Sequence, residues 1–383
     1  MTGRESAAID RVLSWVRDSA LPLWHLKGWD HRHGGFIERF DADGAPERDA
    51  PRRMRVQARQ VYVYAHAALL GWYEPAAVLA LDGFSWLIER CWARDGRPGF
   101  VHLVEADGTL ADGRRDAYDQ AFGLLALAWA YRLRPDAQVR ALIGAELDYL
   151  DAAFADPVHG GWFESDPPAL PRRQNPQMHA FEAMLALHEA TGEAMFIDRA
   201  RRFLDLLERR LYDPATGAVH EYFDASFRTL PSVEGRIAEP GHHFEWTWLL
   251  HAYARLCGEA VRPLAGPIYD WAERHGLDAG SFVMDEVRDD GAPHAASIRL
   301  WPHTEYVKAN AVRHEAGVCP RAAGNVEAMW ARFLPRFTAV EPRGGWVDRF
   351  DAEGRLTDAR RLASSFYHVF GAAAETARVL RPA

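Results

Sequence analysis

Apolar residues recur at helical spacing along most of the chain, in pairs of stretches that short glycine-led turns separate. These stretches include residues 118–131, 139–154, 179–190, 194–211, 244–256 and 366–380. The stretch 121–129 is apolar on every face of the helix that it predicts. Because such a helix must be covered on all sides, we predict an inner layer of helices enclosed by an outer layer.

The turns repeat as regularly as the helices do. Six times a glycine, or a glycine pair, precedes an aromatic or apolar residue and a short acidic segment. The equivalent positions are taken as Phe36, Phe100, Trp162, Val219, Phe282 and Trp346. They are 57 to 64 residues apart, which accommodates two average helices, a hairpin and the connecting loops. Regular steps of this length indicate a repeat architecture.

Six helical hairpins bury their apolar faces best when they close into a ring. We therefore predict an all-α protein, an (α/α)6 barrel in which six helical hairpins form a toroid, with short β-hairpins or loops at the active-site rim. The whole chain, residues 1–383, is expected to be a single domain. The alternative is an open helical-repeat scaffold that binds other proteins.

One polar residue stands out against the apolar background of each repeat, 17 to 23 residues after the turn. These residues are Arg59, Tyr118, His179, His242, Glu305 and His368. Equivalent positions of the six repeats lie at the same end of a closed ring, so we expect a polar pocket at that rim. The N-termini of the inner helices are nearby, and they favour oxygen atoms of a ligand. Nearby aromatic residues such as Trp301 and Tyr367 suit stacking on a sugar ring. We expect the other histidines, among them His66, His188, His243, His251 and His303, to be structural or surface residues.

Composition narrows the class of protein. The net charge is −9 with dispersed basic residues, and this predicts no nucleic-acid partner. The chain starts without a secretion signal and has no apolar run long enough to span a membrane, so we expect a cytoplasmic protein. Three widely spaced cysteines support neither a disulfide framework nor a zinc knuckle. Nucleotide-binding glycine motifs are missing, and no cofactor is expected. Lys27 and Lys308 are the only lysines.

Five segments at repeat spacing together resemble one family. They are 55–62 (RVQARQVY), 175–182 (NPQMHAFE), 240–246 (PGHHFEW), 301–305 (WPHTE) and 367–370 (YHVF). This set resembles the N-acylglucosamine 2-epimerase superfamily, which includes mannose isomerases and cellobiose 2-epimerases. The resemblance implies the (α/α)6 barrel and proton transfer next to a sugar carbonyl, usually without a metal. It also implies that His242 and His368 are the two general acid/base residues. Positions expected to bind substrate are Arg59, Tyr118, Asn175, His179, Glu245, Trp301 and Glu305.

The segments 59–62 and 118–122 look more like mannose isomerases than like disaccharide epimerases. We therefore predict mannose to fructose interconversion through a cis-enediol. A histidine with a pKa near the working pH can take and return the carbon-bound proton, and Arg59 can stabilise the enediolate. Our hypothesis gives the carbon-bound proton to His368 and ring opening to His242. Glu245, three residues after His242, is expected to orient that imidazole or raise its pKa.

Several alternatives stay open at this point. A 2-epimerase acting on N-acylglucosamine, on mannose and glucose or on cellobiose would need only small changes in the pocket. An inverting glycoside hydrolase would use Glu245 and Glu305 as its carboxylate pair. A metal site could use the set His179, His242, Glu245, Glu305 and His368, although no close metal-binding spacing supports it. The expected partner is a small monosaccharide, and the outer helices are compatible with a homodimer.

Overall fold

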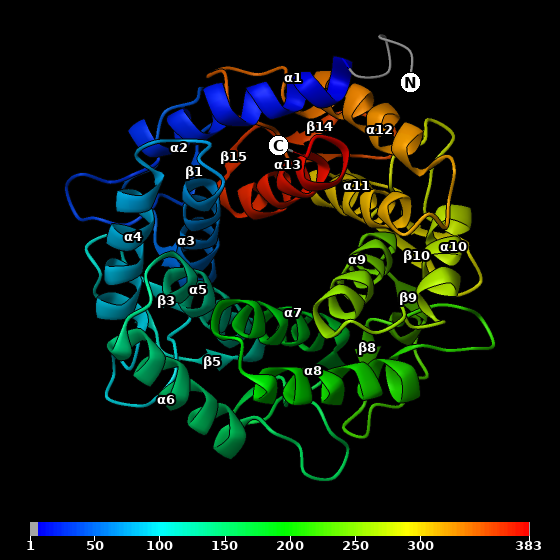
Figure 1. Cartoon of the computed structure of the whole chain (residues 1–383), viewed down its shortest axis with the longest axis horizontal. Helices are drawn as coiled ribbons and strands as arrows, with labels where there is room; N and C mark the ends of the chain where they lie inside the picture. Colours follow the sequence, from blue (N-terminus) through cyan, green and yellow to red (C-terminus); the bar gives the residue numbers. More distant parts are fainter. Residues whose placement is uncertain (1–6, 383) are drawn as a thin grey trace.

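The computed structural model describes residues 7–382, which form two concentric rings of helices (Figure 1). The inner ring contains α3 (Met54–Leu69), α5 (Ala117–Leu133), α7 (Gln174–Thr191), α9 (Pro240–Cys257), α11 (Leu300–Glu315) and α13 (Phe366–Leu380). The outer ring contains α4 (Ala76–Cys91), α6 (Ala137–Ala153), α8 (Ala194–Leu206), α10 (Ala265–His275), α12 (Ala322–Phe337) and the N-terminal pair α1 (Ala7–Trp15) and α2 (Leu21–Leu26). This arrangement confirms the predicted (α/α)6 barrel; residues 1–6 and 383 of the predicted domain lie outside the described residues.

Four short helical turns complete the helical part of the chain. Two are π-helical, η1 (Val16–Ala20) and η2 (Leu207–Leu211), and two are 3-10 turns, η3 (Glu234–Arg236) and η4 (Ala363–Ser365). The π-helical turn η2 extends α8 to the end of the predicted stretch 194–211. The turn η4 leads directly into α13, so the last inner helix effectively begins three residues earlier than its α-helical part.

The ring is closed at the junction of its two ends. Helix α1 packs against α12, and the last inner helix α13 packs against the first, α3. Strand β1 (Arg39–Phe40) pairs with β15 (Arg361–Leu362), so the first and last hairpins share a sheet. An open scaffold, which would leave one face of its inner helices wet, is therefore not what this chain forms.

Short antiparallel sheets join neighbouring repeats at one end of the barrel. The remaining strands are β2 (Arg52–Arg53), β3 (Leu103–Val104), β4 (Leu110–Asp112), β5 (Arg115–Asp116), β6 (Ser165–Asp166), β7 (Arg172–Arg173), β8 (Tyr222–Phe223), β9 (Ile237–Ala238), β10 (Glu286–Arg288), β11 (Pro293–Ala295), β12 (Ile298–Arg299), β13 (Arg349–Phe350) and β14 (Leu356–Asp358). The pairs β2–β3, β5–β6, β7–β8, β9–β10 and β12–β13 each connect the strand before one inner helix to the next repeat. They place the starts of the inner helices around one rim.

Helix α5 shows why the inner ring forms. The carboxylate of Asp116 accepts hydrogen bonds from the backbone N–H groups of Tyr118 and Asp119, at 3.0 and 3.4 Å, and so caps the helix. All residues from Asp119 to Ala130 are buried. The neighbouring helices α3 and α7 cover this surface, because a helix that is apolar on every face is stable only when it is surrounded.

The fourth residue of each of the first five inner helices ties its helix to the turn of its own repeat. In the first three, the side-chain amides of Gln57, Gln120 and Gln177 each bond both the N–H and the C=O of the turn residue. In the next two, Nε2 of His243 and His303 accepts from the N–H of the turn residue. These two histidines are structural, as predicted.

The same contacts correct the predicted repeat register at one position. In the fifth repeat, His303 bonds Val283 rather than Phe282, and Val283 forms the β-bridge to Leu277. Val283 is fully buried, whereas Phe282 is only partly buried. The sequence suggests Phe282 because the turns of most other repeats carry an aromatic side chain there, but the equivalent residue is Val283.

No helix within residues 7–382 is both long enough and apolar enough to cross a bilayer.

Candidate active site

A cavity of about 270 Å³ opens among the loops and the first turns of the inner helices. Its lining residues are Arg59, Tyr118, Asn175, His179, Glu239, His242, Glu245, Arg299, Trp301, Asp348, Leu362, Ser364, Ser365 and His368. Eight of the nine predicted site residues are in this set, so one cavity brings together side chains from all six repeats. The ninth, Glu305, lies behind His368 and holds it.

The inner helices present their polar residues in layers. The sixth residue of each helix, counted from Ala363 for the last one, forms a ring made of Arg59, Phe122, His179, Glu245, Glu305 and His368. Tyr118 and His242 lie one turn nearer the rim, at the second and third positions of their helices. Four of the six singled-out residues therefore share one layer, and the other two lie nearer the rim of the same cavity.

A second layer of polar groups comes from the turn segments. These groups lie two residues after the equivalent turn residue of each repeat, which is Val283 in the fifth. They are Glu38, His102, Glu164, Glu221, Asp285 and Asp348, and the five acidic side chains are buried. In three repeats this carboxylate bonds the arginine just before the inner helix, as Asp285 bonds Arg299 at 2.9 Å. In the fourth repeat its partner is the catalytic candidate His242.

His242 is held as a cation. Its Nδ1 lies 2.9 Å from Oε1 of Glu221 and 3.8 Å from Oε2 of Glu239. Burial alone would lower the pKa of His242, but the charges of Glu221 and Glu239 more than offset burial and raise the pKa to about 9. Glu245, which was expected to orient this imidazole or raise its pKa, also raises the pKa of His242, by a smaller amount than Glu221 and Glu239 do. The side chain that orients His242 is Glu221.

The surroundings of His368 favour its neutral form. Its Nδ1 lies 2.8 Å from Oε1 of Glu305, and its Nε2 has no hydrogen-bond partner among residues 7–382. Burial lowers the pKa of His368 well below its usual value, and the positive charges of Arg59 and Lys308 lower it further. A neutral imidazole that donates from Nδ1 carries its lone pair on Nε2, which makes His368 a base.

Trp301 lies between the two histidines. Its ring centroid is 5.0 Å from that of His242 and 5.4 Å from that of His368. An indole face beside an acid and a base suits the stacking of an apolar sugar face. Trp301 is thus one of the predicted aromatic residues and is near both histidines that are expected to be the acid and the base.

Arg59 and His179 complete the wall of the cavity. Arg59 donates from Nη2 to the hydroxyl of Tyr118 at 2.5 Å and from Nη1 to the backbone oxygen of Ser364 at 3.1 Å. Nδ1 of His179 lies 2.8 Å from Oε2 of Glu182. The guanidinium of Arg59 has no carboxylate partner within the described part of the chain, so its charge is available to a ligand.

Two residues that line the cavity carry buried acceptor atoms with no hydrogen bond from residues 7–382. Both carboxylate oxygens of Glu245 and the side-chain oxygen Oδ1 of Asn175 have no hydrogen bond. Because an unmade hydrogen bond at a buried polar atom costs about 1–3 kcal/mol, such atoms favour a ligand that donates from hydroxyl groups. The cavity is therefore suited to a polyol.

The carboxylate geometry argues against an inverting glycosidase. Ligand atoms of Glu245, Glu305 and His368 all lie within 4.8 Å of one another, whereas an inverting pair is separated by roughly 6.5–9.5 Å. The same three residues also form a potential metal-binding group. The Lys308 ammonium lies 2.5 Å from Oε2 of Glu305 and 3.9 Å from Oε1 of Glu245. In this group, one of three with such geometry, a fixed cation thus already offsets part of the carboxylate charge.

Sequence reasoning missed Glu221, Glu239, Arg299 and Asp348. The signal for Glu221 and Asp348 was present, because an acidic residue follows the turn in five of the six repeats. Glu239 and Arg299 stand directly before inner helices, where they face each other with Nη2 of Arg299 3.2 Å from Oε2 of Glu239.

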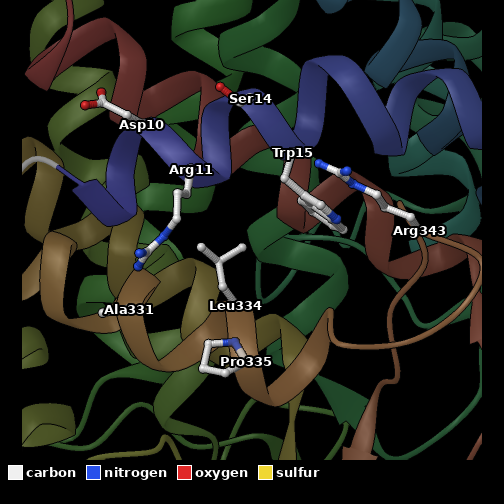
Figure 2. A pocket seen from close by; sticks show the side chains of 8 residues that line it. All are labelled: Asp10, Arg11, Ser14, Trp15, Ala331, Leu334, Pro335 and Arg343. Carbon is white, nitrogen blue, oxygen red and sulfur yellow. The ribbon is translucent and has the colours of Figure 1, made fainter.

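A wider depression of about 690 Å³ lies elsewhere, on the outer wall between α1 and α12 (Figure 2). Trp15, Leu334 and Pro335 face it together with Arg11 and Arg343. It contains neither a histidine nor a converging acid/base pair, so we place the reaction in the smaller cavity at the rim.

The barrel and its cavity together define a class: an (α/α)6 enzyme that moves protons on a small polyhydroxylated substrate. The sequence profile of the N-acylglucosamine 2-epimerase (GlcNAc 2-epimerase) family matches residues 35–372. The chain belongs to this family, and it is an isomerase or epimerase.

Individual relatives support the same class. The chain is 37% identical over 376 residues to a mannose-6-phosphate isomerase of Rhizobium meliloti (strain 1021), with 94% of each chain covered. It is 30% identical over 311 residues to a D-mannose isomerase of Thermobifida fusca, covering 74% of this chain and 73% of the relative. The structure of cellobiose 2-epimerase from Bacillus thermoamylovorans B4167 superposes with a TM-score of 0.88 at 18% identity, covering 97% and 98% of the two chains, and shows the same fold.

Proposed function

We propose that this protein interconverts mannose and fructose through a cis-enediol, with His368 as the base and His242 as the acid. The observation that carries the proposal is the opposite charge state of two histidines on the same cavity. Carboxylates raise the pKa of His242 to about 9, whereas burial lowers that of His368 well below its usual value. Two groups whose surroundings separate their pKa values in this way are an acid/base pair.

The reaction uses these states in order. The imidazolium of His242 donates its Nε2 proton to the ring oxygen as the C1–O5 bond breaks. The neutral imidazole then takes the proton that the O1 hydroxyl releases as the aldehyde forms, so His242 is a cation again when the pyranose is open. Nε2 of His368 then takes the C2 proton, and the guanidinium of Arg59 stabilises the enediolate oxygens. The hydroxyl proton moves from O2 to O1, and His368 returns its proton to C1. The bonds broken and formed then balance, and no metal or redox cofactor is required.

The charges around the cavity favour an uncharged sugar over a sugar phosphate. Arg299 is shared between Asp285 and Glu239, which neutralise it. Glu239, Glu245 and Asp348 also line the cavity. A phosphate dianion would meet these carboxylates with only Arg59 uncommitted, and like charges in a buried site repel. We therefore assign free mannose, although one relative is named for a phosphorylated substrate.

A 2-epimerase is the second candidate. It would return the C2 proton to the opposite face of C2, and His242 and His368 on the two sides of Trp301 would be suitable for that reaction as well. The similarity to cellobiose 2-epimerase in fold supports this candidate. The identity of the product decides between the two.

A substrate panel tests the proposal. The purified protein is incubated with mannose, mannose 6-phosphate, glucose, N-acetylmannosamine and cellobiose, with and without EDTA, and the products are separated by chromatography. We expect fructose from mannose at a rate that EDTA does not change. Conversion of mannose 6-phosphate alone would contradict the charge argument, and conversion of none of the sugars would contradict the proposed function.

Replacing Glu221 with glutamine should move the alkaline limit of activity. An acid must be protonated to act, so activity falls as pH rises through the pKa of His242. Without the Glu221 charge that pKa drops, and the alkaline limb of kcat/KM moves to lower pH. A drop of one unit gives a loss of roughly fivefold at pH 9 that approaches about tenfold at higher pH.

Glu164→Gln is the matched control for this variant. Glu164 occupies the same place in its repeat but holds Arg173 instead of a histidine. Its alkaline limb should stay where it is in the wild type. Equal shifts in both variants would show that the effect does not pass through His242.

A further inference from the structure

One of the two lysines of this chain is buried beneath the active site. Lys308 lies one helical turn after Glu305 on α11 and is 2% exposed. Its ammonium is 2.5 Å from Oε2 of Glu305, 3.9 Å from Oε1 of Glu245 and 3.7 Å from the ring centre of Trp248. A lysine is rarely buried without a partner, so this one has a specific electrostatic task.

Three buried carboxylates surround this cation, each from a different inner helix. They are Glu182 on α7, Glu245 on α9 and Glu305 on α11. From α13, the hydroxyl of Tyr367 donates to Oε1 of Glu182. Besides Lys308, the groups whose positive charge acts on His368 are Arg59 on α3, His179 on α7 and His242 on α9. Carboxylates packed this closely cannot all stay ionised without a compensating charge.

We propose that Lys308 is a positioning residue that keeps Glu305 an ionised acceptor, so that His368 donates from Nδ1 and keeps its lone pair on Nε2. This inference rests on the proposed function of His368 as the base. Glu305 links the two residues directly: Oε2 faces the ammonium, and Oε1 faces Nδ1 of His368 at 2.8 Å.

Burial and the charge of Glu245 raise the pKa of Glu305 well above its usual value, and the Lys308 ammonium is the strongest influence in the opposite direction. The ionised form of Glu305 therefore depends on this ammonium more than on any other single group. Burial would lower the pKa of Lys308, but Glu305 and Glu245 raise it above its usual value, so the amine remains charged. Lys308 also helps to lower the pKa of His368.

Removing the ammonium would let the Glu305–His368 pair bind an extra proton at higher pH. If the proton goes to His368, the imidazole becomes a cation. If it goes to Glu305, the protonated carboxyl donates to Nδ1 and the imidazole carries its hydrogen on Nε2. In both cases the lone pair on Nε2 is lost, and the base with it.

The test compares Lys308→Met with Lys308→Arg and with Lys27→Met, which alters the other, exposed lysine. In Lys308→Met we expect kcat to fall on the order of 10²-fold with little change in KM, and the acid limb of kcat/KM to move to higher pH. Lys308→Arg keeps the charge and should return the acid limb to its wild-type position. Lys27→Met should behave as the wild type.

A titration followed by NMR of the His368 ring nitrogens gives a readout that does not need turnover. In folded Lys308→Met, checked by thermal unfolding, the pair should take up its proton at higher pH than in the wild type. An unchanged titration and an unchanged acid limb would overturn the proposal, as would a rise in KM alone. If the wild type converts none of the sugars, the proposed function fails, while the titration still reports whether Lys308 acts on His368.

Discussion

Replacing His368 with asparagine is expected to lower kcat for mannose isomerisation on the order of 10³- to 10⁴-fold. The asparagine amide can still donate to Glu305, as Nδ1 of His368 does at 2.8 Å, so the buried carboxylate keeps a partner. What is lost is the basic Nε2, and without it the C2 proton has no acceptor. Fructose formation measured by chromatography, together with exchange of the C2 proton in D2O, checks this expectation.

His303→Gln is the matched control for His368→Asn. His303 is also a buried histidine, but its ring only ties α11 to its turn. Gln57, Gln120 and Gln177 perform this task in other repeats. The control should therefore fold and keep its activity. Substantial exchange of the C2 proton in folded His368→Asn would remove His368 from the role of base.

Replacing His242 with glutamine should produce the second largest loss, on the order of 10²- to 10³-fold in kcat/KM. In the proposed mechanism, mannose binds as a closed ring and His242 provides the proton that opens it. The alkaline limb, which we attribute to the pKa of about 9 of His242, should also disappear from the pH profile. Initial rates measured from pH 6 to pH 10 test both effects.

His243→Gln is the control for His242→Gln. His243 lies beside His242 on α9 and bonds the backbone of Val219 and Glu239, so His243→Gln should leave the pH profile unchanged. Because His368 is intact, His242→Gln should retain measurable exchange of the carbon-bound proton when the small open-chain fraction of substrate is sampled. Complete loss of exchange in His242→Gln, with exchange retained in His368→Asn, would reverse the two roles.

The barrel could be predicted from the sequence because its signal is repeated. Six turns at similar spacing define the hairpins, and an all-round apolar stretch such as 121–129 defines an inner helix. Which turn residues are equivalent between repeats was harder to predict. Phe282 and Val283 are both apolar, and only the hydrogen bond that the Val283 N–H donates to Nε2 of His303 and the bridge to Leu277 show that Val283 is the equivalent residue.

The residues that line the cavity could be predicted for the same reason, whereas the hydrogen-bond partners of these residues could not. Helical spacing suggested Glu245 as the partner of His242, but a spacing of three residues says nothing about contacts with other segments. Glu221 reaches His242 from the preceding turn, 21 residues earlier in the chain. Lys308 was noticed only for its rarity, since its burial among carboxylates of three helices is a property of the closed ring.

The most direct measurement of the central claim is the analysis by NMR of the products formed from mannose in D2O. If His368 takes the proton from C2, exchanges it with D2O and delivers a deuteron to C1, the fructose carries deuterium at C1, and His368→Asn incorporates no label. Glucose labelled at C2 and formed without fructose would contradict the claim and show that this cavity carries out 2-epimerisation.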